Sequence, residues 1–185
     1  MLSEDDGKYL LSVAKDAIET YVKENRKIDT PSDCPDYMHE ELGVFVTLNK
    51  HNNLRGCIGY PEPVYPLIDA VIDSAISAAM RDPRFPSVDE SELDSLDYEI
   101  TVLTKPQIIE VEKPIDYLDN IIIGEDGLIV ERGFYRGLLL PQVAPEHNMD
   151  KEEFLSHTCM KAGLRPDAWL DENTKVYKFQ GQIFK

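Results

Sequence analysis

The stretch GVFVTLNKHNNLRGCIGY, residues 43–60, decides the fold. Residues 43–48 are rich in β-branched and aromatic side chains, which is typical of a strand. Residues 49–53 are polar and suit a turn, and residues 54–60 are apolar again. The stretch therefore predicts a β-hairpin whose two strands are joined by a five-residue loop.

A helix and a third strand follow this hairpin. Residues 67–80 are apolar or small on nearly every face, which predicts a helix buried on more than one side. Residues 98–103 alternate in character and predict a strand. Residues 43–104 therefore spell strand, strand, helix, strand, which is one compact α/β unit.

Similar elements are predicted on both sides of that unit. Ser3 and Asp6 form a capping pair before an amphipathic helix, and Asp150 caps a later helix. Residues 120–123 and 128–131 flank a Gly-Glu-Asp-Gly segment and predict a second hairpin. Hairpins mixed with helices favour an α+β fold, a mixed α/β arrangement, over a doubly wound parallel sheet.

The length of the chain suits a single domain. It has 185 residues and a mass of 21.1 kDa. A compact body of this size removes about 70% of its unfolded surface from water, which is enough for a self-sufficient core. We expect one domain over residues 1–185, with residues 43–104 as its inner unit.

The charge balance excludes several classes of function. Lys and Arg number 19 against 35 Asp and Glu, so the formal net charge is −16. A phosphate backbone repels such a chain, which argues against general nucleic-acid binding. The longest apolar runs, such as residues 121–123 and 138–140, are far shorter than the ~20 residues that cross a bilayer. We expect neither nucleic acid nor a membrane as a partner.

The N-terminus and the cysteines indicate a compartment. The opening residues, MLSEDD, lack the basic and apolar portions of a secretory signal. Cys34, Cys57 and Cys159 are an odd number without close pairing, so reduced thiols are expected. Together these features predict a cytoplasmic protein.

The segment LRGCIG, residues 54–59, carries the first candidate site. In a regular strand, alternation places Arg55 and Cys57 on one face, where the guanidinium would favour the thiolate and make Cys57 a candidate nucleophile. Gly56 has no side chain and would allow a ligand or a bulge close to the backbone. The alternative is that Cys57 is a small packed hydrophobe and that the glycines only bend the strand.

The segment RDPRFP, residues 81–86, is the second candidate. Arg81 and Arg84 are separated by a proline-stiffened turn at a helix end and could present two planar forks to a carboxylate or phosphate. The alternative is that neighbours such as Asp82 or Asp89 neutralise these arginines.

Two adjacent residues, Glu146 and His147, could move a proton, and His147 is the histidine best placed to act as a general base. A solvated loop histidine is the alternative. His157 and Cys159 would point about 200° apart on a helix, so they do not make a metal site. The sequence also lacks a glycine-rich phosphate loop and a nucleophile elbow. We expect no metal and no cofactor.

Five blocks of sequence together resemble the AMMECR-one domain family, also called protein A of the AmmeMemoRadiSam system. LRGCIG is the signature of that family, and the similarity covers almost the whole chain. In order, the blocks are GVFVTL (43–48), LRGCIG (54–59), RDPRFP (81–86), LLPQVA (139–144) and FLSHTCMKAGL (154–164).

This resemblance implies a body of two unequal lobes, each a largely antiparallel sheet packed with helices, with a cleft between them where the signature residues gather. It also implies association with Memo-like and radical SAM proteins. The biochemical activity of the family is not established.

Two functions remain open after these observations. In the first, the chain is an accessory or binding component of a Memo-like and radical SAM modification system, and its cleft holds a partner without turnover. In the second, it is a cysteine-dependent enzyme: Cys57 attacks a small anionic substrate that Arg81 or Arg84 orients, while Glu146 or His147 moves a proton. The binding role ranks first, because no complete triad or metal shell can be assembled from the sequence.

Overall fold

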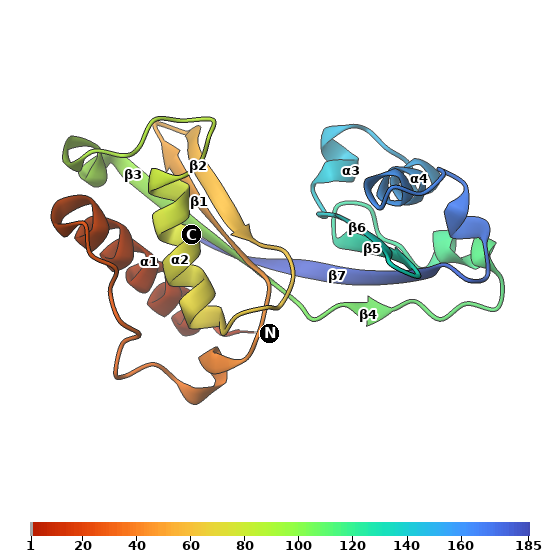
Figure 1. The fold of residues 1–185 in the computed structure, drawn as a ribbon, viewed down its shortest axis with the longest axis horizontal. Helices are drawn as coiled ribbons and strands as arrows, with labels where there is room; N and C mark the ends of the chain where they lie inside the picture. Colours follow the sequence, from red (N-terminus) through yellow and green to blue (C-terminus); the bar gives the residue numbers. More distant parts are fainter. Residues whose placement is uncertain (1) are drawn as a thin grey trace. The chain divides into compact units, whose positions relative to one another are not determined.

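The computed structural model describes residues 2–185, which form two compact units. The first unit holds the residues up to Thr104 together with Gln182–Lys185, and the second holds Lys105–Gly181. Helices combine with antiparallel strand pairs in both (Figure 1). The predicted α+β class is therefore confirmed, and so is its division into unequal parts.

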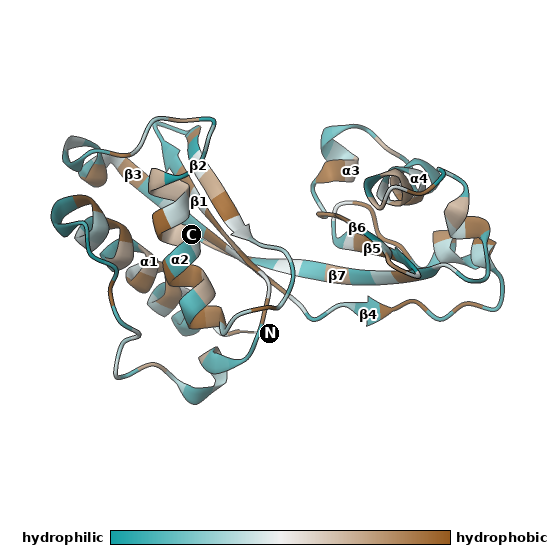
Figure 2. Ribbon diagram, viewed as in Figure 1, coloured by the Kyte–Doolittle hydropathy of each residue, from teal (hydrophilic) through white to brown (hydrophobic). Residues whose placement is uncertain are grey.

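The first unit contains two long helices. Helix α1 (Glu4–Glu24) begins with the predicted capping box, in which the Ser3 and Asp6 side chains each accept a hydrogen bond from the other residue's backbone N–H. Helix α2 (Leu67–Met80) has the predicted bounds, and most of its residues are buried. Figure 2 shows apolar residues spread over α2, whereas α1 mixes apolar and hydrophilic residues. Helix α2 is accordingly the centre of this core. The unit also has two 3-10 turns, η1 (Asp36–His39) and η2 (Glu90–Ser95).

Three strands of the first unit form an antiparallel sheet in the order β2-β1-β3. They are β1 (Val44–Lys50), β2 (Asn53–Tyr60) and β3 (Leu96–Leu103). Val46, Leu48 and Ile100 are fully buried in the cluster that includes the apolar residues of α1 and α2. One face of the sheet therefore packs on the helices, and the residues between, such as Thr47, point to the other face.

The β1–β2 hairpin is tighter than predicted. Its strands are joined by His51 and Asn52, which both have positive φ, at 52° and 63°. A two-residue turn of this kind matches the twist of the strands, so Asn49 and Lys50 continue β1 instead of forming a loop. The predicted five-residue loop was wrong for this reason. The register also shifts: Leu48 pairs with Gly56 but Asn49 pairs with Leu54, which leaves Arg55 as the extra residue of a β-bulge.

The second unit is built on strands β4 to β7. Strand β5 pairs with β6 and β7, and β4 pairs with β7, all antiparallel. Helix α4 packs against β5 and β6 (Figure 1). The elements are β4 (Gln107–Ile108), β5 (Asp126–Arg132), β6 (Tyr135–Leu139), β7 (Lys175–Phe184, whose end belongs to the first unit), α3 (Val143–Glu146), α4 (Lys151–Lys161), and the 3-10 turns η3 (Pro114–Asp119) and η4 (Ala168–Leu170).

The second hairpin lies one segment later than predicted. Residues 120–123 form no strand, because the Ile122 carbonyl accepts hydrogen bonds from the backbone N–H groups of Glu125 and Asp126 in a turn. The hairpin instead joins β5 to β6 through Gly133 and Phe134. The helix predicted after Asp150 is confirmed as α4, with its capping box.

Candidate functional site

The signature segment lies in β2, an edge strand on which side chains bind the outward backbone groups of Cys57. The Cys57 N–H donates to Oδ2 of Asp82 at 2.9 Å, and the Cys57 carbonyl accepts from Nη2 of Arg84 at 3.2 Å. Asp82 and Arg84 are themselves an ion pair at 2.7 Å. We call Asp82 and Arg84 the edge clip, because together they take the hydrogen-bonding place of a neighbouring strand.

The local sequence explains the position of the clip. Helix α2 ends at Met80, and Pro83 cannot continue it, so the chain turns with the Phe85 N–H bonded to the Asp82 carbonyl. The Asp82 side chain is almost entirely buried. Its hydrogen bonds with the Arg84 guanidinium hold its pKa far below the usual range, although burial acts in the opposite direction. The Asp82 carboxylate of the edge clip is therefore held in its charged form.

The Cys57 thiol is half-buried and lies beside a hydroxyl group. Because both backbone groups of Cys57 point to the edge clip, Thr47 and Cys57 face each other as a non-hydrogen-bonded pair, in which side chains approach closely. Thr47 Oγ1 donates to Cys57 Sγ at 3.3 Å. Thr47 was not recognised from the sequence, since its role depends on strand register.

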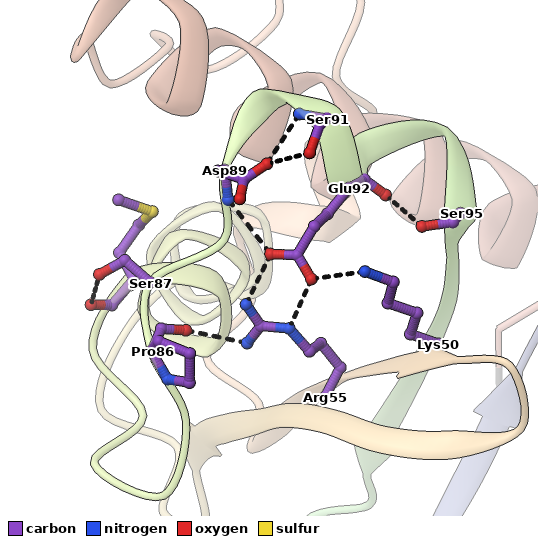
Figure 3. Close-up of polar contacts among 9 residues, drawn as sticks. Lys50, Arg55, Pro86, Ser87, Asp89, Ser91, Glu92 and Ser95 are labelled. Carbon is purple, nitrogen blue, oxygen red and sulfur yellow. Dashed lines mark hydrogen bonds and ion pairs between the residues drawn. The ribbon is translucent and has the colours of Figure 1, made fainter.

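Arg55 belongs to a separate cluster (Figure 3). Its Nε and Nη2 donate to the two oxygens of Glu92 at 3.0 and 2.8 Å, and its Nη1 donates to the Pro86 carbonyl at 2.9 Å. Lys50 binds the same carboxylate at 2.8 Å. These hydrogen bonds, first that of Arg55 and then that of Lys50, lower the pKa of Glu92 to about 2.

The predicted pairing of Arg55 with Cys57 on one face was wrong. The β-bulge at Arg55 interrupts the alternation on which that prediction depended, and the Arg55 side chain binds the segment that follows α2. The guanidinium that contacts Cys57 is that of Arg84. Glu92 was not recognised from the sequence. It lies 37 residues after Arg55 in the chain, and nothing in its local sequence indicates that the two side chains meet.

The space where a side chain of residue 56 would lie is filled by the backbone of α2. A Cβ atom at this position would lie 2.1 Å from the Ala78 carbonyl oxygen of α2. The absence of a side chain therefore serves close packing of β2 on α2. This corrects the prediction that Gly56 exposes backbone to a ligand.

The two arginines of RDPRFP have different surroundings. The Arg84 guanidinium is bound by Asp82, as the alternative interpretation of this segment predicted. The Arg81 side chain is 56% exposed, with Nη1 3.3 Å from Ser77 Oγ and 3.8 Å from Asp73. The structure therefore gives each guanidinium its own acidic neighbour and does not form a shared anion site.

Glu146 and His147 belong to the second unit. Glu146 ends the single turn of α3, and His147 follows as its C-cap. His147 and His157 line a surface groove of about 430 Å³. Among residues 2–185 no three His, Cys, Asp or Glu side chains gather where they could hold a metal ion. Within the same range, no helix combines the length and the apolar character needed to cross a bilayer.

Comparison with known proteins identifies the relatives of this chain. The family model AMMECR1 matches residues 11–184. A protein of Methanothermobacter thermautotrophicus is 58% identical over 99% of this chain and 95% of its own length. Protein PF1979 of Pyrococcus furiosus is 52% identical over 100% of this chain and 90% of its own length.

A solved structure supports the same assignment. The crystal structure of the uncharacterized protein PH0010 from Pyrococcus horikoshii matches 98% of this chain and 92% of its own, with a TM-score of 0.82 and 51% identity. Similarity in sequence and in fold extends over nearly all of the residues, the LRGCIG and RDPRFP segments included, and the chain belongs to the AMMECR1 family.

Proposed function

We propose that this protein is a noncatalytic binding component, an accessory to Memo-like and radical SAM proteins in a modification system. The supporting observation is that the charged residues of its signature segments bind one another. Arg55 is paired with Glu92, and Arg84 with Asp82. These pairs build a rigid platform from β2, the end of α2 and the segment that follows it.

Energetics favour a platform over an anion-binding catalytic site. An anionic substrate would have to draw Arg84 away from Asp82, whose side chain is almost fully buried. Because the Arg84 side chain is 53% exposed, solvent screens part of this pair, and separating it costs less than the loss of about 3–5 kcal/mol that is typical of a fully buried pair. A small anion would therefore bind Arg84 weakly, whereas a protein surface can contact the platform without separating the pair.

The exposed side chains of the platform are the ones available to a partner. Arg81 projects from the end of α2, and Leu54 is exposed at the start of β2. Arginine is enriched among the residues that contribute most of the binding energy at protein interfaces, so Arg81 is the first candidate contact.

Binding measurements with purified proteins test the proposal. The chain is titrated into the Memo-like protein and the radical SAM protein from its own organism, and the heat of binding is recorded. We expect measurable affinity for at least one of them, unchanged in Cys57→Ser and weakened at least tenfold in Arg81→Ala. Arg26→Ala is the matched control, since Arg26 is 58% exposed in the same unit. Absence of binding to both proteins would contradict the proposal.

A second candidate function is a cysteine-dependent enzyme that acts on a small anionic substrate. Its supporting observation is the half-buried Cys57, whose thiol accepts a hydrogen bond from the Thr47 hydroxyl and whose backbone carbonyl accepts one from the Arg84 guanidinium. Alkylation of the native protein with iodoacetamide across pH, followed by peptide mapping, separates the two functions. Rapid labelling of Cys57 below pH 7 that slows in a folded Arg84→Gln variant would favour the enzyme. Labelling that starts only near pH 8 would favour the platform.

The proposal also places the protein in the cytoplasm. Cys34, Cys57 and Cys159 are all free thiols, which supports a reducing compartment. Fractionation of cells with an antibody to the native protein would test this directly.

A further inference from the structure

The tip of the β5–β6 hairpin holds a fully exposed aromatic side chain. Arg132 pairs with Tyr135, so the turn consists of Gly133 and Phe134 alone. Phe134 has a relative exposure of 106%, and Tyr135 next to it is 57% exposed. None of residues 2–185 covers the phenyl ring.

The turn itself does not require phenylalanine. Gly133 supplies the positive φ, at 60°, and Phe134 adds none, which is the pattern of a type II′ turn. The β1–β2 hairpin makes its own two-residue turn with the polar residues His51 and Asn52. Burying an aromatic side chain of this size away from water is favourable, and the exposed Phe134 ring does not gain this stabilisation within its own chain.

A surface groove in the same unit has the complementary character. Leu139, Val143, Met149 and Met160 supply apolar walls to the groove of about 430 Å³. A space of that volume admits an aromatic ring. Methionine side chains adapt their shape and form favourable contacts between sulfur and aromatic rings.

The tip and the groove are neighbours on the second unit. Strand β6 leads from Tyr135 to Leu139, a distance of about 14 Å for four residues of strand. The end of α4 reaches toward the tip as well, since a Cβ atom on Gly163 would lie 3.9 Å from the Tyr135 ring. Each copy of the chain therefore carries a projecting ring and a receiving groove close together.

We infer that Phe134 of one copy occupies the groove of a second copy, and that the exchange is reciprocal, giving a two-fold dimer. A two-fold arrangement uses both features of both copies and closes after two subunits. This inference does not depend on the proposed function.

The local charges permit this contact although the net charge of the chain is −16. At the tip, Arg132 pairs with Asp171 at 2.7 Å and Arg136 with Glu131 at 2.8 Å. The residues that line the groove include Lys161 and no acid. Repulsion between two copies therefore comes from acids elsewhere, and added salt screens it. We expect the dimer to become tighter as the salt concentration rises.

Sedimentation and light scattering over a range of protein concentrations up to about 1 mM test the inference. The wild-type protein is expected to pass from monomer to dimer as concentration rises. Phe134→Ser and Met160→Lys should each weaken the dimer at least tenfold. Ile122→Ser and Leu170→Ser, which change other exposed apolar residues of the second unit, should leave it unchanged.

A second measurement locates the contact. With ¹³C-labelled methionine methyl groups, the aromatic ring current of Phe134 should shift the Met149 and Met160 signals upfield, and the shift should disappear on dilution and in Phe134→Ser. Fluorescence of Trp169, buried in the second unit, verifies that each variant is folded. A wild-type protein that stays monomeric at every concentration and salt level would overturn the inference. So would a dimer that survives both variants, or species that grow beyond two subunits.

Discussion

The two hairpins of this protein both close with two-residue turns, but they serve opposite purposes. The β1–β2 hairpin is bound by the rest of its unit: Gly56 touches α2, Arg55 holds Glu92, and the edge clip binds Cys57. The β5–β6 hairpin ends in Phe134, whose side chain is fully exposed. The hairpin that carries the LRGCIG signature thus makes contacts within its own unit. The hairpin without a signature segment exposes an aromatic side chain to solvent.

The largest difference between the hairpins is expected on adding a methyl group to a glycine of each. In Gly56→Ala the new Cβ would meet the Ala78 carbonyl oxygen at 2.1 Å, and neither backbone can yield cheaply, so we expect a loss of more than about 3 kcal/mol. Gly133→Ala meets no atom within 4 Å and suffers only from its positive φ, about 1–2 kcal/mol. Urea unfolding followed by far-UV circular dichroism measures both. Equal losses would contradict the comparison.

Neutralising one carboxylate that pairs with an arginine of each hairpin comes next. Glu92→Gln removes the charge that Arg55 holds in a largely buried pair, and we expect a loss of about 2–3 kcal/mol. Glu131→Gln breaks the pair with Arg136 at the same 2.8 Å distance but in a more exposed position, where the loss should stay below about 1 kcal/mol. The same unfolding experiment compares the two variants. A larger loss of stability in Glu131→Gln would show that burial does not determine how much each ion pair contributes.

Acid should weaken the first unit through Glu92. Its pKa is lowered to about 2 in the folded protein, against an ordinary value of 4.5, so the stabilisation is complete above pH 4.5 and is lost as the pH falls toward 2. We expect this group to account for a decrease on the order of 2 kcal/mol between pH 5 and pH 2. Unfolding curves of wild type and Glu92→Gln over this range should converge at low pH. Parallel curves would exclude Glu92 as the source.

The smallest effects are expected at the two turns. Asn52→Gly relieves a positive φ of 63° and should stabilise the first hairpin by about 0.5 kcal/mol. Phe134→Ser removes a fully exposed side chain and should change monomer stability by less than about 0.5 kcal/mol. Thermal unfolding at a concentration low enough to exclude association measures both. A large loss in Phe134→Ser would mean that the ring has a partner within its own chain.

Periodicity and capping predicted most of the helices and the first three strands. Helix α2 has the predicted bounds, and the Ser3 and Asp150 caps begin α1 and α4 as expected. These elements follow from local rules: side-chain spacing along a helix and hydrogen bonds across three residues. These helices and strands could therefore be predicted without knowledge of the tertiary structure.

The site could be predicted only in part, because its contacts depend on register. Arg55 and Cys57 were recognised, but the bulge that turns Arg55 toward Glu92 exists only in the pairing with β1. The misplaced second hairpin has a similar cause. Ile121 is buried and Ile122 exposed, as in a strand, but backbone hydrogen bonds to the Ile122 carbonyl close a turn there. Whether such alternation forms a strand is decided by the pairing partner.

The edge clip has one more consequence, which concerns the behaviour of the protein at high concentration. An outer strand with free amide and carbonyl groups is a template on which a strand from another molecule can grow, and this is how many sheets begin to aggregate. On β2, at Cys57, both outward groups are already bound, the amide by Asp82 and the carbonyl by Arg84. The Asp82–Arg84 pair therefore blocks the addition of a further strand at this position. A variant without the pair should precipitate sooner than its loss of stability alone would explain.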